Sequence, residues 1–547
     1  MRTLSIVVFA AAAIALSPTQ ARAQGTMELI SVSTTGGPSN GYSFEPSISA
    51  NGRYVAFYSG ATDLVSTTTT GYQVFVRDRW SSTTALVSWN ATSSAGGNST
   101  SSDPSISADG RHVVFASNAT DLVATTVSGQ QVYLRDLDTS ATTLVSVNAA
   151  GNAGGNASSS SPVISGDNRY VAFVSGASDL GPAGNGTAHI YVRDLQTHTT
   201  FLVSAADTDA GDDLGNGPSY EPSISGNGRY VAFESDATDL TSPATTSRQI
   251  FVRDVVDGTT VVASVNTVGA PGNNGSYHAR ITPDGRWVAF SSYSTDLVSP
   301  ATSWRQAFLR DLTGDTTILI SQSTVGVPGN NDSGGYGGGL SSDGRYVAFN
   351  SYANNLIPVD LNSNVDIFVR DHVDETTVRA GEGVDGGEPN GSTEHSAISS
   401  TGRFVAFTSW ASNLVPDDTN TYPDVFVYEL LGPTPDAGVD GGVDGGMDAG
   451  LDAGDTDTGS ATTDSDADTD TDTDTDTDAD ADTDTDTDAD SDSDTGTGDV
   501  DTGTDTTDTG ADAGADAGDG KDNSGCGCAT AGEASRVTLF LLIESLI

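Results

Sequence analysis

The sequence repeats one pattern seven times, and this repeat constrains the fold more than any other feature. The segment SISANGRYVAFYS recurs as SISADGRHVVFAS, VISGDNRYVAFVS, SISGNGRYVAFES, RITPDGRWVAFSS, GLSSDGRYVAFNS and AISSTGRFVAFTS. A second motif of the type VFVRD keeps the same interval of 57 to 60 residues. The arginines of the first motif are Arg53, Arg111, Arg169, Arg229, Arg286, Arg345 and Arg403. A fixed period of this kind indicates a repeat architecture.

Within one repeat, apolar residues alternate with polar ones, which is typical of half-buried strands. In the first copy we predict strands at Pro46–Ser49, Tyr54–Tyr58, Gln73–Asp78 and Thr84–Trp89. Four short antiparallel strands in each repeat describe a propeller blade, so we predict an all-β, seven-bladed β-propeller. Because the repeated Arg and Asp recur in every blade, we expect them to pair structurally.

The two ends of the repeat region predict how the ring closes. The seventh copy stops after Leu430 without a fourth strand, whereas Met27–Ser33 matches that strand. We therefore expect the N-terminal strand to complete the seventh blade and to leave no free edge.

The repeat resembles that of TolB-like β-propellers, whose signature reads approximately S-x-D-G-x-x-I-A-F and then I-x-x-x-D. The resemblance covers residues 27–431 and implies the fold. It implies no particular activity, because propellers support many.

The segments outside residues 24–432 predict export and display. Residues 1–23 have Arg2, an apolar stretch from Leu4 to Leu16 and a small-x-small cleavage pattern, so they read as a signal peptide. Residues 433–522 hold 31 Asp and one Lys and cannot form a core, so we predict a disordered acidic stalk. This charge excludes nucleic acid as a main partner. No apolar run is long enough to span a membrane in the mature body.

Residues 523–547 contain the only cysteines, Cys526 and Cys528, so the body has no disulfide framework. A Gly-Cys pair between a polar spacer and an apolar end resembles the myxobacterial C-terminal sorting signal, which implies anchoring at the cysteine. Here the apolar run is short, Glu544 interrupts it and no basic cluster follows, which departs from that signal and predicts a truncated one. We expect a cell-surface or outer-membrane protein, or a secreted one if the signal does not function. The alternative is a soft-metal or disulfide pair.

Aromatic residues concentrate in the long loops of blades four to seven. One column of the loop between strands two and three reads Gly60, Asn118, Gly176, Asp236, Tyr293, Tyr352 and Trp410. The loops that lead from strand four to the next blade add Tyr220, Tyr277, Tyr336 and Tyr42. The predicted ligand-binding residues are Tyr293, Tyr352, Trp410, Tyr277, Tyr336, Arg248 and Arg305. Exposed aromatic faces suit sugars or apolar partner side chains, which favours a glycan or protein ligand. The alternative is that these rings pack as core beneath the loops.

Two further patterns offer metal ligands. The innermost strands place Glu45, Asp103, Ser161, Glu221, His278, Gly337 and His395 in one column, and we expect this channel column to ring one mouth of the central channel. His395, Glu45 and Asp103 come from adjacent blades and could hold a divalent metal, or could simply be solvated. Asp360-x-Asn-x-Asn-x-Asp366 and Asp418-x-Asn-x-x-x-Asp424 offer alternating oxygen atoms to calcium, or form ordinary polar loops. We expect no obligatory cofactor.

The sequence favours a monomeric, non-enzymatic binding protein. A GxSxG match at Gly37–Gly41 lacks the strand-turn-helix context of a hydrolase, and no HExxH motif or phosphate loop is present. The alternative function is a metal-assisted polysaccharide lyase or hydrolase that acts at the mouth of the central channel.

Overall fold

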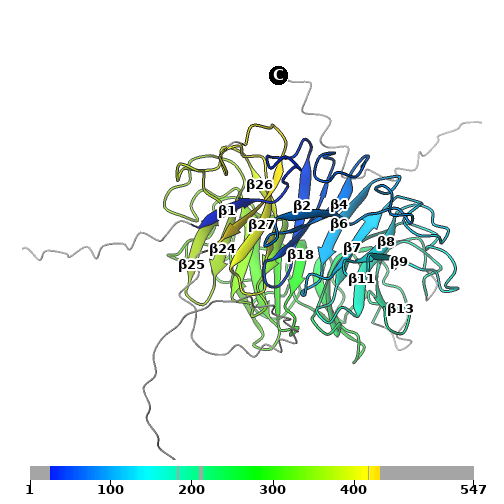
Figure 1. The fold of residues 1–547 in the computed structure, drawn as a ribbon. Coiled ribbons are helices and arrows are strands. Elements are labelled where there is room, and N and C mark those ends of the chain that lie inside the picture. The colour runs from blue at the N-terminus through cyan, green and yellow to red at the C-terminus, as the bar shows by residue number, and fades with distance from the viewer. Residues whose placement is uncertain (1–24, 182–183, 208–212, 417, 431–547) are drawn as a thin grey trace, which may run out of the picture. The chain divides into compact units, whose positions relative to one another are not determined.

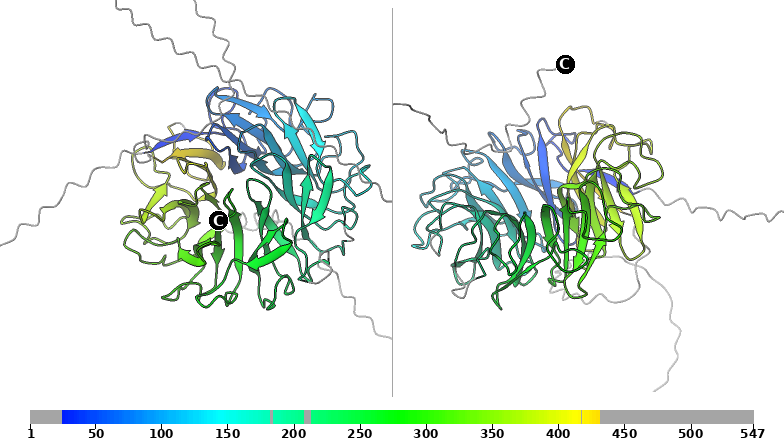
Figure 2. Two further views of the ribbon diagram at one scale, coloured as in Figure 1. Left: turned by 90° about the horizontal axis from the view of Figure 1, so that it is seen from below. Right: turned by 180° about the vertical axis from the view of Figure 1, so that it is seen from behind.

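The computed structural model describes residues 25–181, 184–207, 213–416 and 418–430. They form seven four-stranded antiparallel sheets, and no helix occurs in these ranges. Figure 2 (left) shows the sheets arranged around a central axis like the blades of a propeller. The predicted fold class is confirmed.

The blades follow one another in chain order. Blade 1 contains β2 (Ser43–Ile48), β3 (Tyr54–Ser59), β4 (Gln73–Asp78) and β5 (Thr83–Leu86). Blade 2 contains β6 (Ser101–Ile106), β7 (His112–Ser117), β8 (Gln131–Asp136) and β9 (Ala141–Leu144). Blade 3 contains β10 (Ser159–Ile164), β11 (Tyr170–Ser175), β12 (His189–Asp194) and β13 (Thr199–Leu202). Blade 4 contains β14 (Ser219–Ile224), β15 (Tyr230–Ser235), β16 (Gln249–Asp254) and β17 (Thr259–Val262).

The remaining three blades repeat this order. Blade 5 contains β18 (Ser276–Ile281), β19 (Trp287–Ser292), β20 (Gln306–Asp311) and β21 (Thr316–Leu319). Blade 6 contains β22 (Ser333–Leu340), β23 (Tyr346–Ser351), β24 (Asp366–Asp371) and β25 (Thr376–Ala380). Blade 7 contains β26 (Thr393–Ile398), β27 (Phe404–Ser409), β28 (Asp424–Glu429) and β1 (Thr26–Leu29).

Ring closure follows the prediction from the chain ends. Strand β1 pairs antiparallel with β28, with Met27 opposite Tyr428 and Leu29 opposite Phe426. Figure 1 shows β1 in the same blade as β26 and β27, with β28 between β1 and β27 in the sheet order, although β1 and β28 lie at opposite ends of the described chain. The N-terminal strand therefore supplies the outer strand of blade 7.

Aromatic pairs fill the middle of every blade. In each blade a Phe on the second strand stacks on a Phe or Tyr of the third, with ring centroids 5.8 to 6.2 Å apart. Buried Val and Ala side chains flank these rings and pack between neighbouring blades. Because the same layer recurs around the ring, the core is a set of equivalent seams between blades.

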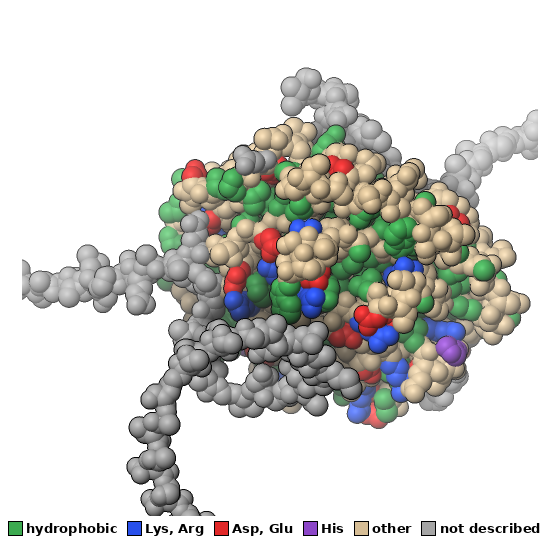
Figure 3. All heavy atoms as spheres, in the orientation of Figure 1, with side chains coloured by type: hydrophobic (Ala, Val, Ile, Leu, Met, Phe, Trp, Pro, Cys, Tyr) green, Lys and Arg blue, Asp and Glu red, His purple; other side chains and the backbone are tan. Residues whose placement is uncertain are grey.

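In each blade an arginine before the second strand pairs with an acidic residue at the end of the third strand. We call this ion pair the arginine–aspartate clamp. Arg53 Nη2 lies 2.7 Å from Asp78 Oδ2, and Asp78 Oδ1 accepts the backbone N–H of Trp80 in the next turn. Five further blades repeat this Arg–Asp pair, and in blade 7 Arg403 pairs with Glu429 instead. Figure 3 shows acidic and basic side chains lying next to one another at several places on one side of the molecule. The repeated charges are structural, as predicted.

The clamps predict acid-sensitive stability. Hydrogen bonding to Arg286 lowers the pKa of Asp311 to about 2. A carboxyl whose pKa is depressed in the folded state stabilises at neutral pH, and this stabilisation is lost as the pH falls from about 4 to about 2. The Arg286 side chain is 47% exposed, which weakens the pair, so we expect Asp311→Asn to lower the unfolding free energy at pH 6 by about 1 kcal/mol or less. In thermal unfolding, the difference in Tm between wild type and this variant should decrease as the pH falls toward 2. A difference that stays constant with pH would contradict the stabilising role of the Asp311 carboxylate.

The predicted signal peptide (1–23), the acidic segment (433–522) and the C-terminal segment with Cys526 and Cys528 lie outside the described residues. Within the described ranges, no helix has the length and apolar character needed to cross a membrane.

Candidate ligand-binding face

The long loops share one face of the propeller. In blade 1 the connections 49–53 and 79–82 are short and lie on one side, because they join antiparallel neighbours at the same end. The connections 60–72 and 87–100 are long and lie on the opposite side. The same order of short and long connections recurs in blades 2 to 6, so the propeller has a short-loop face and a long-loop face.

A cluster of six aromatic rings lies on the long-loop face where blades 7 and 1 meet. Tyr42 lies 5.0 Å from Tyr422 and 6.0 Å from Trp410, measured between ring centroids. Phe44 contacts both Tyr42 and Trp410, at 6.0 and 6.4 Å. The chain of rings continues from Phe44 to Tyr58 at 5.7 Å and on to Tyr72 at 5.6 Å. We call these six residues the closing-seam cluster.

The closing-seam cluster is partly open to solvent. Tyr42 is 38% exposed and Tyr422 is 37% exposed, and the other four rings are half-buried. Core rings of the same blades, such as Phe57 and Phe75, are fully buried. The cluster therefore presents ring surface and is not a continuation of the core.

A second group of rings and cations lies on blades 4 and 5. The Arg248 guanidinium lies 4.6 Å from the Tyr220 ring centroid and 5.4 Å from that of Tyr277. Tyr277 meets Tyr293 edge to face at 6.1 Å, and Arg305 lies over Tyr293 at 5.4 Å. Ion pairs with Glu234 and Asp236 fix the position of Arg248.

The structure divides the predicted aromatic set between these two places. Trp410 belongs to the closing-seam cluster, whereas Tyr277, Tyr293, Arg248 and Arg305 belong to the second group. Tyr352 is 43% exposed and makes no contact with a described ring. Tyr336 lies in β22, and its side chain is outside what the structure describes.

Sequence reasoning missed most of the closing-seam cluster. It singled out Tyr42 and Trp410, but it treated blades four to seven as the aromatic sector. The rings of Phe44, Tyr58 and Tyr72 belong to blade 1, which becomes a neighbour of blade 7 only through ring closure. Combining the predicted closure with the aromatic content of blade 1 could have found them.

The innermost strand of each blade contains a bulge at the residue predicted to ring the channel. Six of these residues have positive φ, between 45° and 61°: Glu45, Asp103, Ser161, Glu221, His278 and His395. The pairing register between the first two strands shifts around them, for example between Phe44 and Ser47. Bulges re-aim side chains and often lie beside functional sites. Their irregular backbone explains why β2 begins at Ser43 and not at the predicted Pro46.

The bulged residues make contacts between neighbouring blades. His395 Nδ1 lies 4.0 Å from Glu45 Oε1, as the predicted metal set requires. Asp103 of blade 2, however, accepts a hydrogen bond from the backbone N–H of Ser161 in blade 3 at 3.3 Å, on the side away from Glu45 and His395. The structure does not complete the predicted set with Asp103.

A different set of three residues converges between blades 4 and 5. One ligand atom from each of Glu221, Glu234 and His278 lies within 4.8 Å of the others, and no other such set occurs among the described residues. His278 Nδ1 lies 2.8 Å from Glu221 Oε2, and the His278 backbone N–H donates to Glu234 Oε2 at 2.9 Å. Burial, together with the nearby Glu221, raises the pKa of Glu234.

This triad could hold a metal ion, but its groups already have partners. Arg248 Nη1 lies 3.0 Å from Glu234 Oε1, so both carboxylate oxygens of Glu234 accept hydrogen bonds. Sequence reasoning placed Glu221 and His278 in the channel column but missed Glu234. The signal was a Glu inside the apolar strand YVAFES, where other copies carry Tyr, Ala, Val, Ser, Asn or Thr.

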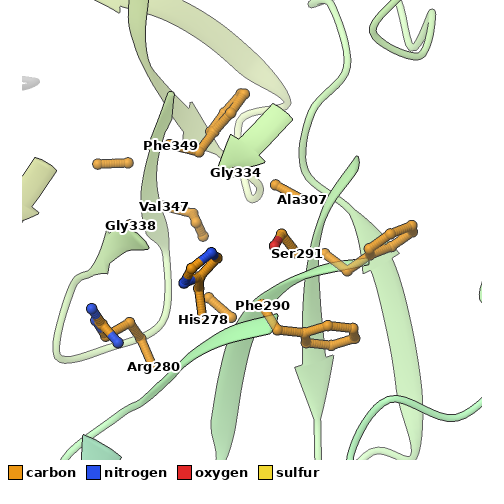
Figure 4. A pocket seen from close by; sticks show the side chains of 12 residues that line it. His278, Arg280, Phe290, Ser291, Ala307, Gly334, Gly338, Val347 and Phe349 are labelled. Atoms are coloured by element: carbon orange, nitrogen blue, oxygen red, sulfur yellow. The ribbon is translucent and has the colours of Figure 1, made fainter. Parts of the chain in front are cut away.

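Two hollows occur among the described blades, and one of them contains His278. Figure 4 shows His278 beside Val347 and Gly338 at a cavity of about 20 Å³, which has room for about one water molecule. A groove of about 310 Å³ between blades 1 and 2 is lined by residues that include Tyr54, Leu86, Trp89 and Leu137. Neither hollow contains a residue of the closing-seam cluster.

Comparison with protein-family models and with curated proteins finds no match. Solved structures with a similar fold include TolB from Acinetobacter baumannii, at 15% identity and a TM-score of 0.35, covering 64% of this chain and 66% of that one. They also include oligogalacturonate lyase from Vibrio parahaemolyticus, at 11% identity, a TM-score of 0.45 and coverage of 74% and 97%. The β-propeller domain of the Trilobed protease from Pyrococcus furiosus matches at 11% identity and 0.42, with coverage of 71% and 94%. TolB is thus among the similar structures, as the repeat motif predicted, and no activity follows from these likenesses.

Proposed function

We propose that this protein is a non-enzymatic binding protein that holds a glycan on its long-loop face through the closing-seam cluster. The observation that carries the proposal is the set of six contacting, half-exposed rings where blades 7 and 1 meet. The flat apolar face of a sugar ring packs on such surfaces, and polar groups at the edge fix its orientation.

Polar groups beside the closing-seam cluster favour a sugar over an apolar protein surface. Glu45 follows Phe44 in β2, and His395 lies 4.0 Å away from Glu45. Glu394, on the inner strand of blade 7, is half-buried, and burial raises the pKa of its carboxyl. Carboxyl and imidazole groups beside aromatic rings can bind sugar hydroxyls. Residues 24–432 hold 41 acidic residues and 18 Arg, so polyanionic glycans should be disfavoured.

A glycan array probed with the full-length protein tests this proposal. We expect binding to neutral or amino sugars and little binding to sulfated or uronic acid polymers. Wild-type protein and the double variant Tyr42→Ala/Trp410→Ala should differ on the same array. Binding that is equal for both proteins, or no glycan binding together with capture of a specific protein partner, would overturn the proposal.

We further propose that the propeller is exported and displayed at the cell surface. This rests on the signal-like residues 1–23 and on the acidic segment 433–522, whose many like charges repel one another and suit a spacer. Surface labelling of intact cells, compared with the culture medium, would separate an anchored protein from a secreted one.

A second candidate function, metal-assisted polysaccharide cleavage, rests on the Glu221, Glu234 and His278 triad. Metal analysis of the purified protein and activity on a polysaccharide panel test it directly. Activity that Glu234→Gln abolishes would favour this function.

A further inference from the structure

The first residue of the third strand distinguishes blades 6 and 7 from the other blades. It is Gln in blades 1, 2, 4 and 5, and His in blade 3. In blade 1 the Gln73 amide N–H groups donate to the carbonyls of Thr70, Gly97 and Ser99, at 3.0, 3.1 and 3.1 Å. The amide oxygen of Gln73 accepts from Ser88 at 2.7 Å. A neutral side chain therefore satisfies several buried carbonyl oxygens in these blades.

Blades 6 and 7 replace this amide with a carboxylate. The residues are Asp366 and Asp424, and both are fully buried. A carboxylate cannot donate to the loop carbonyls, so a neighbouring amide does so in part. Asn420 Nδ2 donates to Asp424 Oδ2 at 2.8 Å and to the Ser39 carbonyl at 3.1 Å. Asn362 donates to Asp366 Oδ2 at 2.9 Å and reaches the Pro389 carbonyl at 3.4 Å.

A second carboxylate stands near each buried one. Asp360 precedes Asp366 by six residues, and Asp418 precedes Asp424 by the same interval. Burial is the main cause that raises the pKa of Asp366 and of Asp424 to about 6, and the neighbouring Asp of each pair adds to the rise. Each loop therefore brings two like charges together in a place that water does not screen well.

The charges of the two loops do not balance. In blade 6, Arg379 Nη1 lies 3.5 Å from Asp366 Oδ2 and 3.3 Å from Glu388 Oε1. Together with Asp360, this loop therefore has three carboxylates and one guanidinium. In blade 7, Leu29 takes the place of Arg379, since Leu29 pairs with Phe426 as Arg379 pairs with Phe368. No described Lys, Arg or His forms an ion pair with Asp418 or Asp424. Each loop thus retains two unbalanced negative charges.

Two oxygen atoms of these carboxylates are buried and have no hydrogen-bond partner among the residues that the structure describes. They are Oδ1 of Asp366, whose side chain is 1% exposed, and Oδ1 of Asp418. A buried carboxylate oxygen without a donor is costly unless a cation approaches it. The two orphaned oxygens belong to the two loops with the surplus charge.

We propose that the loops of blades 6 and 7 each bind one divalent cation, best suited to calcium, between Asp360 and Asp366 and between Asp418 and Asp424. Calcium prefers carboxylate, amide and backbone carbonyl oxygens, which these loops supply, and its charge balances the surplus of each loop. The blade 7 site also ties the two ends of the chain together, because Ser31 Oγ donates to Asp424 Oδ1 at 2.6 Å. The cation there strengthens ring closure.

Thermal unfolding of the full-length protein in EDTA, calcium or magnesium tests the proposal. We expect calcium to raise the Tm by several degrees and magnesium to raise it less. The double variant Asp366→Gln/Asp424→Gln installs the residue that blades 1, 2, 4 and 5 carry, and it should lose this response. The acidic segment 433–522 is identical in both proteins, so calcium that it captures cannot produce the difference.

Terbium luminescence provides a readout that does not depend on the stability of a variant. Tyr422 lies in the blade 7 loop between Asp418 and Asp424, whereas residues 433–522 contain no aromatic side chain to sensitise bound terbium. We expect sensitised emission from wild type, displacement by calcium, and a strong loss in Asp360→Asn/Asp418→Asn. An equal calcium-dependent rise of Tm in wild type and in the Gln variant, or emission unchanged by the Asn substitutions, would overturn the proposal.

Discussion

Deleting residues 24–33 is expected to destabilise the whole propeller and not only blade 7, to which β1 belongs. The deletion removes β1, which pairs with β28 over four residue positions, and Ile30, which is fully buried and donates its N–H to Val425. It also removes Glu28, whose carboxylate pairs with Arg79 of blade 1 at 2.8 Å. Met27 and Leu29 pack against the buried hydrophobic side chains between blades 6 and 7.

The size of this effect is comparable with the total stability of a folded domain. Burial of a large apolar side chain contributes about 1.5–3 kcal/mol, so the loss of Met27, Leu29 and Ile30 costs about 5 kcal/mol or more. Domains are stable by about 5–15 kcal/mol in total. The deletion also leaves β28 as an open edge, which favours aggregation.

Thermal unfolding and size-exclusion chromatography check this prediction, with deletion of residues 433–547 as the matched control. That segment lacks the alternating apolar pattern of the blades, so the control should keep the wild-type Tm. Unchanged Tm and solubility after removal of residues 24–33 would refute the role of β1 in closure. A large loss of Tm in the control would show that the C-terminal segment docks on the propeller.

The sequence predicted what the repeat encodes. Seven copies of one alternating pattern are sufficient to specify strand order, blade number and closure, because every blade repeats the same local choices. The predicted strand Gln73–Asp78 matches β4 residue for residue. The Arg–Asp pairs could also be predicted, because a charge that recurs in every blade belongs to the scaffold.

What the sequence did not predict depends on contacts between different blades. Glu234 meets His278 across a blade boundary, and Phe44 meets Trp410 only because the ring closes. The bulge at Glu45 breaks the period-two pattern, so alternation alone misplaced the start of the first strand. Departures of single blades from the repeat were the useful signal, as Asp366 and Asp424 illustrate.

Substitution of Trp410 is the best test of whether the closing-seam cluster binds a ligand or only stabilises the fold. Trp410 contacts Tyr42 and Phe44, and it is half-buried at the edge of the long-loop face. If it forms part of a glycan platform, Trp410→Ala should weaken binding by about 2 kcal/mol or more, which is about thirtyfold in Kd. Its cost in unfolding free energy should stay below the about 3–5 kcal/mol of a fully buried aromatic residue.

Trp80 offers a matched control for this substitution. It is 68% exposed in the turn between β4 and β5, on the short-loop face, where Arg53 lies over its ring at 4.8 Å. Trp80→Ala removes the same side chain from the opposite face, so glycan affinity measured by calorimetry should not change. A Trp410→Ala protein that melts early yet keeps its affinity would place this ring in the scaffold. Because Trp410 belongs to the same contact chain as Tyr42 and Tyr422, that result would argue against the whole closing-seam cluster and move the binding site toward the bulged residues of the channel.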